Sequence, residues 1–131
     1  MEANNIVLNE LFMMEFYIPQ SNKPILLNLS LLLEEGKYSL TDGLRNKISD
    51  LINKSEDWYP VAVERIRKEF RDCTGLWLVE LNILTNETTQ DFIFGLNFDV
   101  PDDEEHGRGM KMLFPSMRII EYGDAEVSFF N

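Results

Sequence analysis

The amino-acid sequence predicts an α+β fold: a mainly antiparallel sheet of about six strands, with two consecutive helices packed on one face. Apolar residues recur at every second position near the N-terminus and again after residue 76, which is typical of half-buried strands. Between these regions the apolar spacing becomes helical. Strands and helices do not alternate along the chain, so the predicted order is β-β-α-α-β-β-β-β and few strands are expected to pair in parallel.

Length and composition predict one domain that spans residues 1–131. A chain of 131 residues has the usual size of a single domain, and a hydrophobic content of 44% is enough for one core. Seven glycines and five prolines are too few for a low-complexity chain. The sequence therefore excludes an intrinsically disordered protein.

Two strands, paired as a hairpin, are expected in the first 33 residues. In residues 6–18, two-residue spacing places five apolar side chains on one face: Leu8, Phe12, Met14, Phe16 and Ile18. Residues 19–24 have the composition of a turn. In residues 25–33 every odd position is Ile or Leu, while Asn28 and Ser30 fall on the other face.

Two helices are expected next. Ser39 or Thr41 can cap the first helix, whose apolar face is formed by Leu40, Leu44, Ile48, Leu51 and Ile52. A break is expected at residues 55–57, and Pro60 then belongs in the first turn of the second helix, where a missing N–H costs nothing. The apolar face of this helix is formed by Trp58, Ala62, Val63, Ile66 and Phe70, and Gly75 can end it.

The remaining sequence predicts four more strands. They cover residues 76–84, 91–100, 110–114 and 117–122, with a further edge strand at 125–130. Residues 101–109 are expected to form a loop, and Pro115-Ser116 a two-residue hairpin turn. The strongest strand face, formed by Phe92, Phe94, Leu96 and Phe98, is expected to pack beneath Leu44, Ile48, Ile66 and Phe70.

The charge of the chain argues against nucleic acid as its partner. Twelve Lys and Arg residues stand against 23 Asp and Glu residues, so the formal net charge is −11 and the pI is about 4.4. Residues 73–131 carry three basic and eleven acidic residues, which accounts for −8 of this charge. A protein that binds a nucleic-acid backbone neutralises phosphates with Lys and Arg, so no nucleic acid is expected.

The sequence predicts a cytoplasmic protein that does not enter a membrane. The N-terminus lacks the basic region and small-residue cleavage site of a signal peptide. The longest apolar stretch, residues 25–33, is far shorter than the roughly 20 residues of a membrane-spanning helix. Cys73 is the only cysteine, so no intramolecular disulfide can form. The oligomeric state stays open.

The densest polar cluster is the acidic run formed by Asp99, Asp102, Asp103, Glu104, Glu105 and His106. Its carboxylates could supply oxygen ligands to a hard cation such as Ca²⁺. The run lacks the alternating acids and central glycine of an EF-hand, so no metal and no cofactor is expected. The preferred interpretation is a solvated acidic loop, and its functional alternatives are a protein-binding patch or a metal or small-ligand site that uses residues 99–106.

No catalytic motif is found, so a non-enzymatic protein is expected. Cys73 and His106 could in principle form a nucleophile and base. However, Cys73 lies at an expected helix C-terminus beside Asp72, where the helix dipole disfavours a thiolate. His106 is expected to be a turn residue that bonds a neighbouring carbonyl or carboxylate. An enzyme of a kind without a linear motif remains a further alternative.

The C-terminal 30 residues carry one resemblance. Glu105-His106-Gly107 is followed by Gly109, and Gly123-Asp124 comes after the second of the two strands expected next, residues 117–122. This pattern resembles the C-terminal end of several small bacterial families of unknown function, in which an acid-rich E-H-G-x-G opens a hairpin. Some of these families are thought to be immunity proteins against bacterial toxins. The resemblance implies a turn-forming role for these residues and no catalytic residue.

Charge and resemblance together predict a protein-binding domain that acts through an acidic surface and resembles an immunity protein. A basic protein, such as a toxin, is the expected partner, because complementary charge speeds association and selects partners. The candidate contact residues are the four consecutive acids Asp102, Asp103, Glu104 and Glu105.

Overall fold

The computed structural model describes residues 1–34, 36, 39–85 and 92–129, with only the backbone of Glu104 and Glu105. Its strands are β1 (Met13–Phe16), β2 (Ile25–Asn28), β3 (Trp77–Ile83), β4 (Phe92–Val100), β5 (Asp103–Phe114) and β6 (Ile119–Gly123). The helices are α1 (Ser30–Leu33), α2 (Asp42–Asn53) and α3 (Ser55–Glu69). Two 3-10 helices, η1 (Ala3–Asn5) and η2 (Ala125–Ser128), lie near the chain ends.

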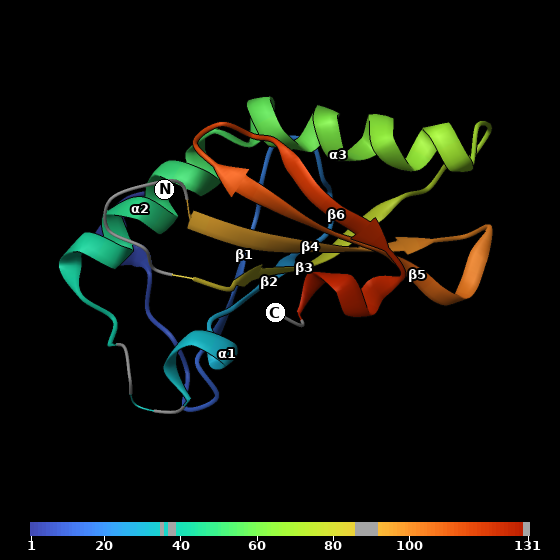
Figure 1. Ribbon diagram of the computed structural model, residues 1–131. Helices are drawn as coiled ribbons and strands as arrows, with labels where there is room; N and C mark the ends of the chain where they lie inside the picture. The colour runs from blue at the N-terminus through green and yellow to red at the C-terminus, as the bar shows by residue number, and fades with distance from the viewer. Residues whose placement is uncertain (35, 37–38, 86–91, 130–131) are drawn as a thin grey trace.

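The six strands form one sheet in chain order, from β1 at one edge to β6 at the other. Among the described strands only β2 and β3 pair in parallel, because the chain leaves β2, forms its three α-helices and returns beside β2. All other neighbours are antiparallel. In Figure 1, α3 lies above the sheet and η2 lies below it.

The α+β class and the mainly antiparallel sheet are confirmed, but the predicted order of elements is wrong. The periodicity of residues 25–33 predicts one strand, yet β2 ends at Asn28 and α1 follows. The side-chain oxygen of Asn28 accepts a hydrogen bond of 2.8 Å from the N–H of Ser30, which turns the chain. The leucines that follow are good helix formers, so they continue as a helical turn.

The first expected strand is also shorter than its pattern. Of residues 6–18 only Met13–Phe16 is a strand. The side-chain oxygen of Asn9 accepts hydrogen bonds from the N–H groups of Leu11 and Met13, at 2.8 and 3.1 Å. This turn interrupts the extended backbone before β1.

The two main helices meet with hardly any break. Thr41 caps α2, since its hydroxyl oxygen accepts a hydrogen bond from the N–H of Leu44. The expected break at residues 55–57 is instead the first turn of α3. The negative charges of Glu56 and Asp57 stabilise this turn because they lie at the positive end of the helix dipole. Pro60 consequently lies inside α3 rather than in its first turn.

The C-terminal region differs from the prediction at three places. Residues 103–109, expected to be loop, belong to β5, so the acidic run forms the end of a hairpin. The expected strand at residues 125–130 is the helix η2, with residue 130 outside the described part. Pro115 and Ser116 do lie between two paired strands, but the connection covers residues 115–118 instead of the two predicted, so β6 begins at Ile119 and not at residue 117. The N–H of Leu113 bonds to the carbonyl oxygen of Arg118 across this connection.

One core lies between the sheet and its helices. The alternating β4 side chains Phe92, Phe94, Leu96 and Phe98 are buried in it, together with Leu44, Ile48 and Ile66, and Phe70 packs at its margin. This agrees with the predicted packing. None of the described helices combines the length and the apolar character needed to cross a membrane.

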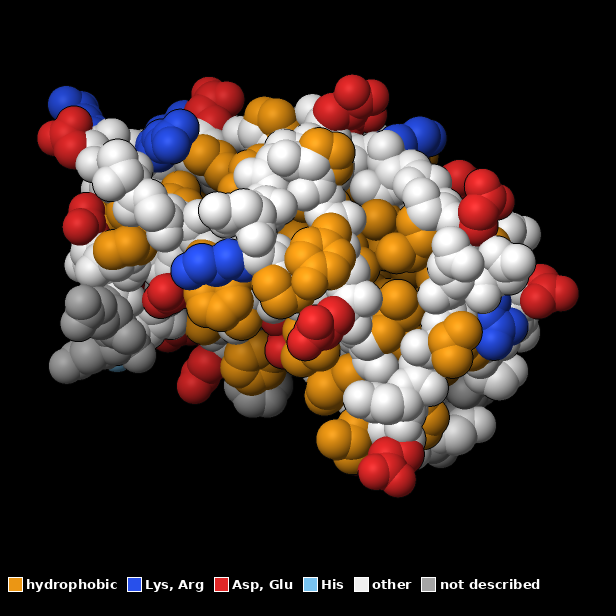
Figure 2. Space-filling model, turned by 180° about the vertical axis from the view of Figure 1, so that it is seen from behind, with side chains coloured by type: hydrophobic (Ala, Val, Ile, Leu, Met, Phe, Trp, Pro, Cys, Tyr) orange, Lys and Arg blue, Asp and Glu red, His pale blue; other side chains and the backbone are white. Residues whose placement is uncertain are grey.

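The segments before and after β1 in the chain expose large hydrophobic side chains. Figure 2 shows the molecule from behind, with hydrophobic side chains gathered across the middle of this face. Near β1 in the chain, the large hydrophobic side chains Val7, Leu11 and Tyr17 are exposed. The acidic candidates lie elsewhere, at the hairpin between β4 and β5.

Candidate functional site

The acidic run begins with Asp99, which is exposed in β4, and continues through the turn between β4 and β5. Asp102 is exposed in this turn, whereas Asp103 is half-buried and already has partners. One oxygen of the Asp103 carboxylate lies 2.9 Å from Nη1 of Arg108, and the other lies 3.5 Å from Nδ1 of His106. The side chains of Glu104 and Glu105 lie outside the described part of the chain. The four candidate acids are therefore not equivalent, because Arg108 already balances the charge of Asp103.

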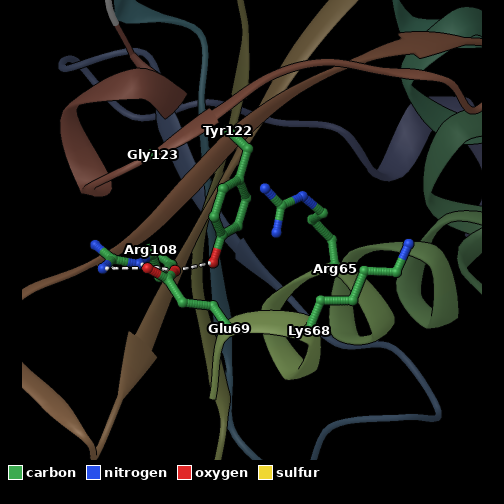
Figure 3. A pocket seen from close by; sticks show the side chains of 6 residues that line it. All are labelled: Arg65, Lys68, Glu69, Arg108, Tyr122 and Gly123. Atoms are coloured by element: carbon green, nitrogen blue, oxygen red, sulfur yellow. Dashed lines mark hydrogen bonds and ion pairs between the residues drawn. The ribbon is translucent and has the colours of Figure 1, made fainter. Parts of the chain in front are cut away.

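Arg108 joins this hairpin to α3 and β6. Its Nε and Nη2 donate hydrogen bonds of 2.7 and 3.1 Å to the two carboxylate oxygens of Glu69. The hydroxyl of Tyr122 donates a further hydrogen bond of 2.8 Å to the same carboxylate. Figure 3 shows Glu69 between Arg108 and Tyr122. Three elements are thus tied together by one carboxylate.

These contacts change the acidity of the three groups. The hydrogen bond from Arg108 holds the pKa of Glu69 below its usual value, and the same bond raises the pKa of Arg108. Burial, followed by the hydrogen bond to Glu69, raises the pKa of Tyr122 to about 12. At neutral pH the network therefore contains an ionised carboxylate, a guanidinium and a neutral phenol.

Beside this network lies a surface depression, here called the acidic hollow. It has a volume of about 600 Å³ and is lined by Glu69, Phe70, Asp102, Asp103, His106, Arg108 and Asp124. Four carboxylates and one guanidinium give it a net charge of −3 when His106 is neutral. Within the described part of the chain, Asp102 and Asp124 have no ion pair, so their charge is free to act on a partner.

The glycines of the C-terminal motif position this hollow. Gly109 pairs with Gly123 across β5 and β6. A Cβ on Gly109 would lie only 2.6 Å from the carbonyl oxygen of Asp124, so a side chain there would push η2 off the sheet. Gly107 has a φ of +61°, which favours glycine. The glycines of the motif thus lie within β5 and allow the backbone of η2 to approach this strand closely. They do not open a hairpin, as the resemblance implied.

Asp124 caps η2, the 3-10 helix whose backbone packs against these glycines. Its side-chain oxygen accepts a hydrogen bond of 3.1 Å from the N–H of Glu126, at the start of η2. Asp124 reaches the acidic hollow because it directly follows β6, whose last residue pairs with β5. The motif therefore brings Asp124 to the hollow that contains Asp102 and Asp103.

Cys73 and His106 show no sign of acting as a pair. Cys73 is buried just after α3, and its thiol lies 3.7 Å from the carbonyl oxygen of Thr74. His106 is exposed on β5, where its Nδ1 lies 3.5 Å from a carboxylate oxygen of Asp103. It lies in a strand, however, and not in a turn.

The described side chains of the acidic run form no metal site. They contain no group of three or more His, Cys, Asp or Glu side chains that could hold a metal ion. The absence of a cofactor stays a prediction.

Sequence reasoning missed Glu69, Arg108 and Tyr122 as a unit. Glu69 and Arg108 are 39 residues apart, and Glu69 and Tyr122 are 53 apart. No local spacing links a helix end to two strands at such separations. The available signal was only the placement of charged residues, including Arg65 and Lys68, along the polar face of α3.

Comparison with known proteins identifies no relative of this chain. No protein-family model matches the chain, and neither curated proteins nor solved structures yield a significant match. The function must therefore be argued from the geometry alone.

Proposed function

We propose that this chain is a non-enzymatic protein-binding domain that recognises a basic protein partner through its acidic hollow, as an immunity protein recognises a toxin. The observation that carries the proposal is the arrangement of carboxylates there: Asp102 and Asp124 are exposed and without an ion pair within the described part of the chain. The neighbouring Glu104 and Glu105 add charge in the sequence.

The position of the hollow supports a binding role. It lies on a rigid scaffold, because the bidentate pair between Arg108 and Glu69 ties the hairpin to α3. A Lys or Arg side chain of a partner that entered it would meet the exposed carboxylate of Asp102 and that of Asp124, which is held by its hydrogen bond to η2. Preorganised charge of this kind raises the association rate more than the affinity.

The four acids named from the sequence have unequal roles in this proposal. Asp102 is a direct contact, and Asp103 acts mainly by holding Arg108 in place. Asp124, which belongs to the glycine motif rather than the acidic run, joins the contact residues. Glu104 and Glu105 remain candidates on charge alone.

The test compares two variants with equal changes in charge. The acidic-hollow variant carries Asp102→Asn and Asp124→Asn, and the second substitution keeps a side-chain oxygen to cap η2. The control variant carries Glu10→Gln and Glu15→Gln, which change exposed residues in and before β1, at the opposite edge of the sheet from β6. Both variants should retain the wild-type melting temperature.

A partner is first isolated by cross-linking in cells that express the chain and is then purified for kinetics. We expect its association rate to fall about tenfold between about 50 and 300 mM salt. Added salt shortens the distance over which exposed charges attract each other, which is about 10 Å at 0.1 M, so the partner is attracted less strongly. The acidic-hollow variant should lose several-fold of this rate at low salt, and the control variant should lose little. Wild-type association by the acidic-hollow variant would contradict the proposal.

Binding of a metal or small ligand by residues 99–106 is the alternative. Thermal melting with Ca²⁺, Mg²⁺ or Mn²⁺ tests it, because an ion that binds only the folded chain raises its stability. We expect no specific rise with any of the three ions. A saturable rise that is lost in Asp103→Asn would favour the alternative.

A further inference from the structure

A second depression, here called the cationic hollow, lies on the other side of the Arg108–Glu69 pair. It has a volume of about 490 Å³ and is lined by Arg65, Lys68, Glu69, Arg108, Tyr122 and Gly123. In Figure 3 the last turns of α3 present Arg65, Lys68 and Glu69 below the strand that carries Tyr122. Three cations thus surround one carboxylate in a chain whose net charge is −11.

The carboxylate in this hollow already has hydrogen-bond partners within the protein. Glu69 accepts both hydrogen bonds from Arg108 and one from Tyr122. The charge of Arg108 is balanced in turn by Glu69 and by Asp103, whose carboxylate lies 2.9 Å away. The Tyr122 hydroxyl uses its only proton on Glu69, and with a pKa of about 12 it stays neutral. These groups form a closed network.

Arg65 and Lys68 also line the hollow, but they take no part in the hydrogen bonds of this network. The guanidinium of Arg65 lies 3.7 Å from the centroid of the Tyr122 ring, which holds it by a cation–π contact. Among the described residues, neither Arg65 nor Lys68 has an ion pair or a hydrogen bond from its side chain. Residues three apart on a helix are neighbours, so both side chains leave the same part of α3. In Figure 3 the Arg65 guanidinium lies beside Tyr122, and the Lys68 ammonium extends along the helix. The charge of Arg65 adds to that of Arg108 in lowering the pKa of Glu69.

We propose that the cationic hollow binds a phosphate group. The side chains that line the hollow, three cations and one carboxylate, carry a net charge of +2. A phosphate dianion would neutralise this charge, whereas a carboxylate would neutralise only half of it. A guanidinium offers a planar set of donors that suits phosphate oxygens, and here Tyr122 already orients it. Lys68 adds a flexible point charge from the same helix face.

The inference does not depend on a protein partner. The acidic hollow attracts cations and the cationic hollow attracts anions, and Glu69 and Arg108 form the wall between them. Phosphate binding can therefore be measured on the isolated chain, and its failure would leave the proposed function unaffected.

The experiment follows backbone amide signals by NMR while phosphate is added at pH 8 and constant ionic strength. Phosphate groups carry about two negative charges at this pH. We expect shifts centred on Tyr122 and Gly123 that saturate below about 20 mM phosphate, which corresponds to weak binding. Sulfate, also a dianion, should compete, and acetate should not.

Matched variants assign the effect to the hollow. Arg65→Gln and Lys68→Gln should each weaken binding about tenfold, and Arg65→Lys should lie between Arg65→Gln and the wild type because it keeps the charge without the planar donors. Arg67→Gln is the control, since Arg67 is exposed on the same helix but does not line the hollow. It should change binding less than about twofold, as a remote charge does when ionic strength is held constant.

A second arm identifies the source of the phosphate. Phenyl phosphate and O-phosphoserine are titrated in the same way as inorganic phosphate. Tighter binding of either ester indicates a phosphorylated ligand, and equal binding indicates free phosphate. The proposal is overturned if no shift saturates, if acetate binds as well as phosphate, or if Arg67→Gln weakens binding as much as Arg65→Gln.

Discussion

Glu69 shows at the scale of one residue how an exposed carboxylate can hold distant segments together. It lies at the end of α3, and its side chain is 41% exposed, yet it accepts three hydrogen bonds from β5 and β6. Solvent weakens such contacts, and surface ion pairs contribute about 1 kcal/mol or less. The bidentate geometry from Arg108 places this pair at the upper end of that range.

Substitution of Glu69 should therefore give a pH-dependent change in stability. The folded-state pKa of Glu69 lies below its usual value of 4.5. The stabilisation is complete above the unfolded-state pKa and is lost as the pH falls through the folded-state pKa. We expect Glu69→Gln to lower the free energy of unfolding by about 1 kcal/mol at pH 7, and by progressively less below about pH 4.5. Urea unfolding across this pH range measures the difference; a constant gap would contradict the assignment.

At the scale of one element, the position of η2 depends on two glycines in the strands that it packs against. It packs on the face of the sheet opposite α3, where Gly95 of β4 and Gly109 of β5 leave room for its backbone. A Cβ built on Gly95 would overlap the carbonyl oxygen of Ser128. Because the obstacle is backbone, it cannot be relieved by a change of rotamer.

Gly95→Ala should consequently destabilise the protein, by about 1–3 kcal/mol, through overpacking. Gly43→Ala is the control, because Gly43 lies in α2 with open space around it and only the Thr41 hydroxyl within 4 Å. In a helix that substitution should stabilise by up to about 1 kcal/mol. Chemical denaturation of both variants gives the two signs, and equal effects would show that η2 does not press on β4.

At the scale of the whole molecule, one core connects the sheet to the helices. Phe94 is fully buried at its centre, with its ring centroid 6.1 Å from that of Trp58 in an edge-to-face arrangement. The indole N–H of Trp58 donates a 2.7 Å hydrogen bond to the carbonyl oxygen of Leu51. This contact links α3 to α2, so a loss of packing at Phe94 should be felt by both helices and by the sheet.

Phe94→Ala is expected to lower the free energy of unfolding by about 3–5 kcal/mol, since it leaves a cavity in a closely packed core. Ile93→Ala is the neighbouring control, because Ile93 points to the other face of β4 and is only half-buried. Its cost should be clearly smaller. Thermal and urea unfolding measure both variants, and a nearly unchanged melting curve for Phe94→Ala would contradict this core.

The candidate site was only partly predictable. The sequence singled out Asp102 and Asp103, which line the acidic hollow, because four consecutive acids are visible as a run. It linked Asp124 to them only through the glycine motif, and it offered no reason to connect Glu69 with Arg108 or Tyr122. Their contacts depend on where α3 ends relative to β5 and β6, and no periodicity within one element contains that information.

The sequence by itself determined the α+β class, the buried faces of α2, α3 and β4, and the acidic character of the C-terminal half. These features follow from periodicity and charge, which act between residues close in the chain. Only the tertiary structure decided that residues 25–33 divide into β2 and α1, that residues 125–128 form η2, and that Glu69 separates two hollows of opposite charge. Apolar runs fit a strand or a helix equally well, and what each segment packs against decides between them.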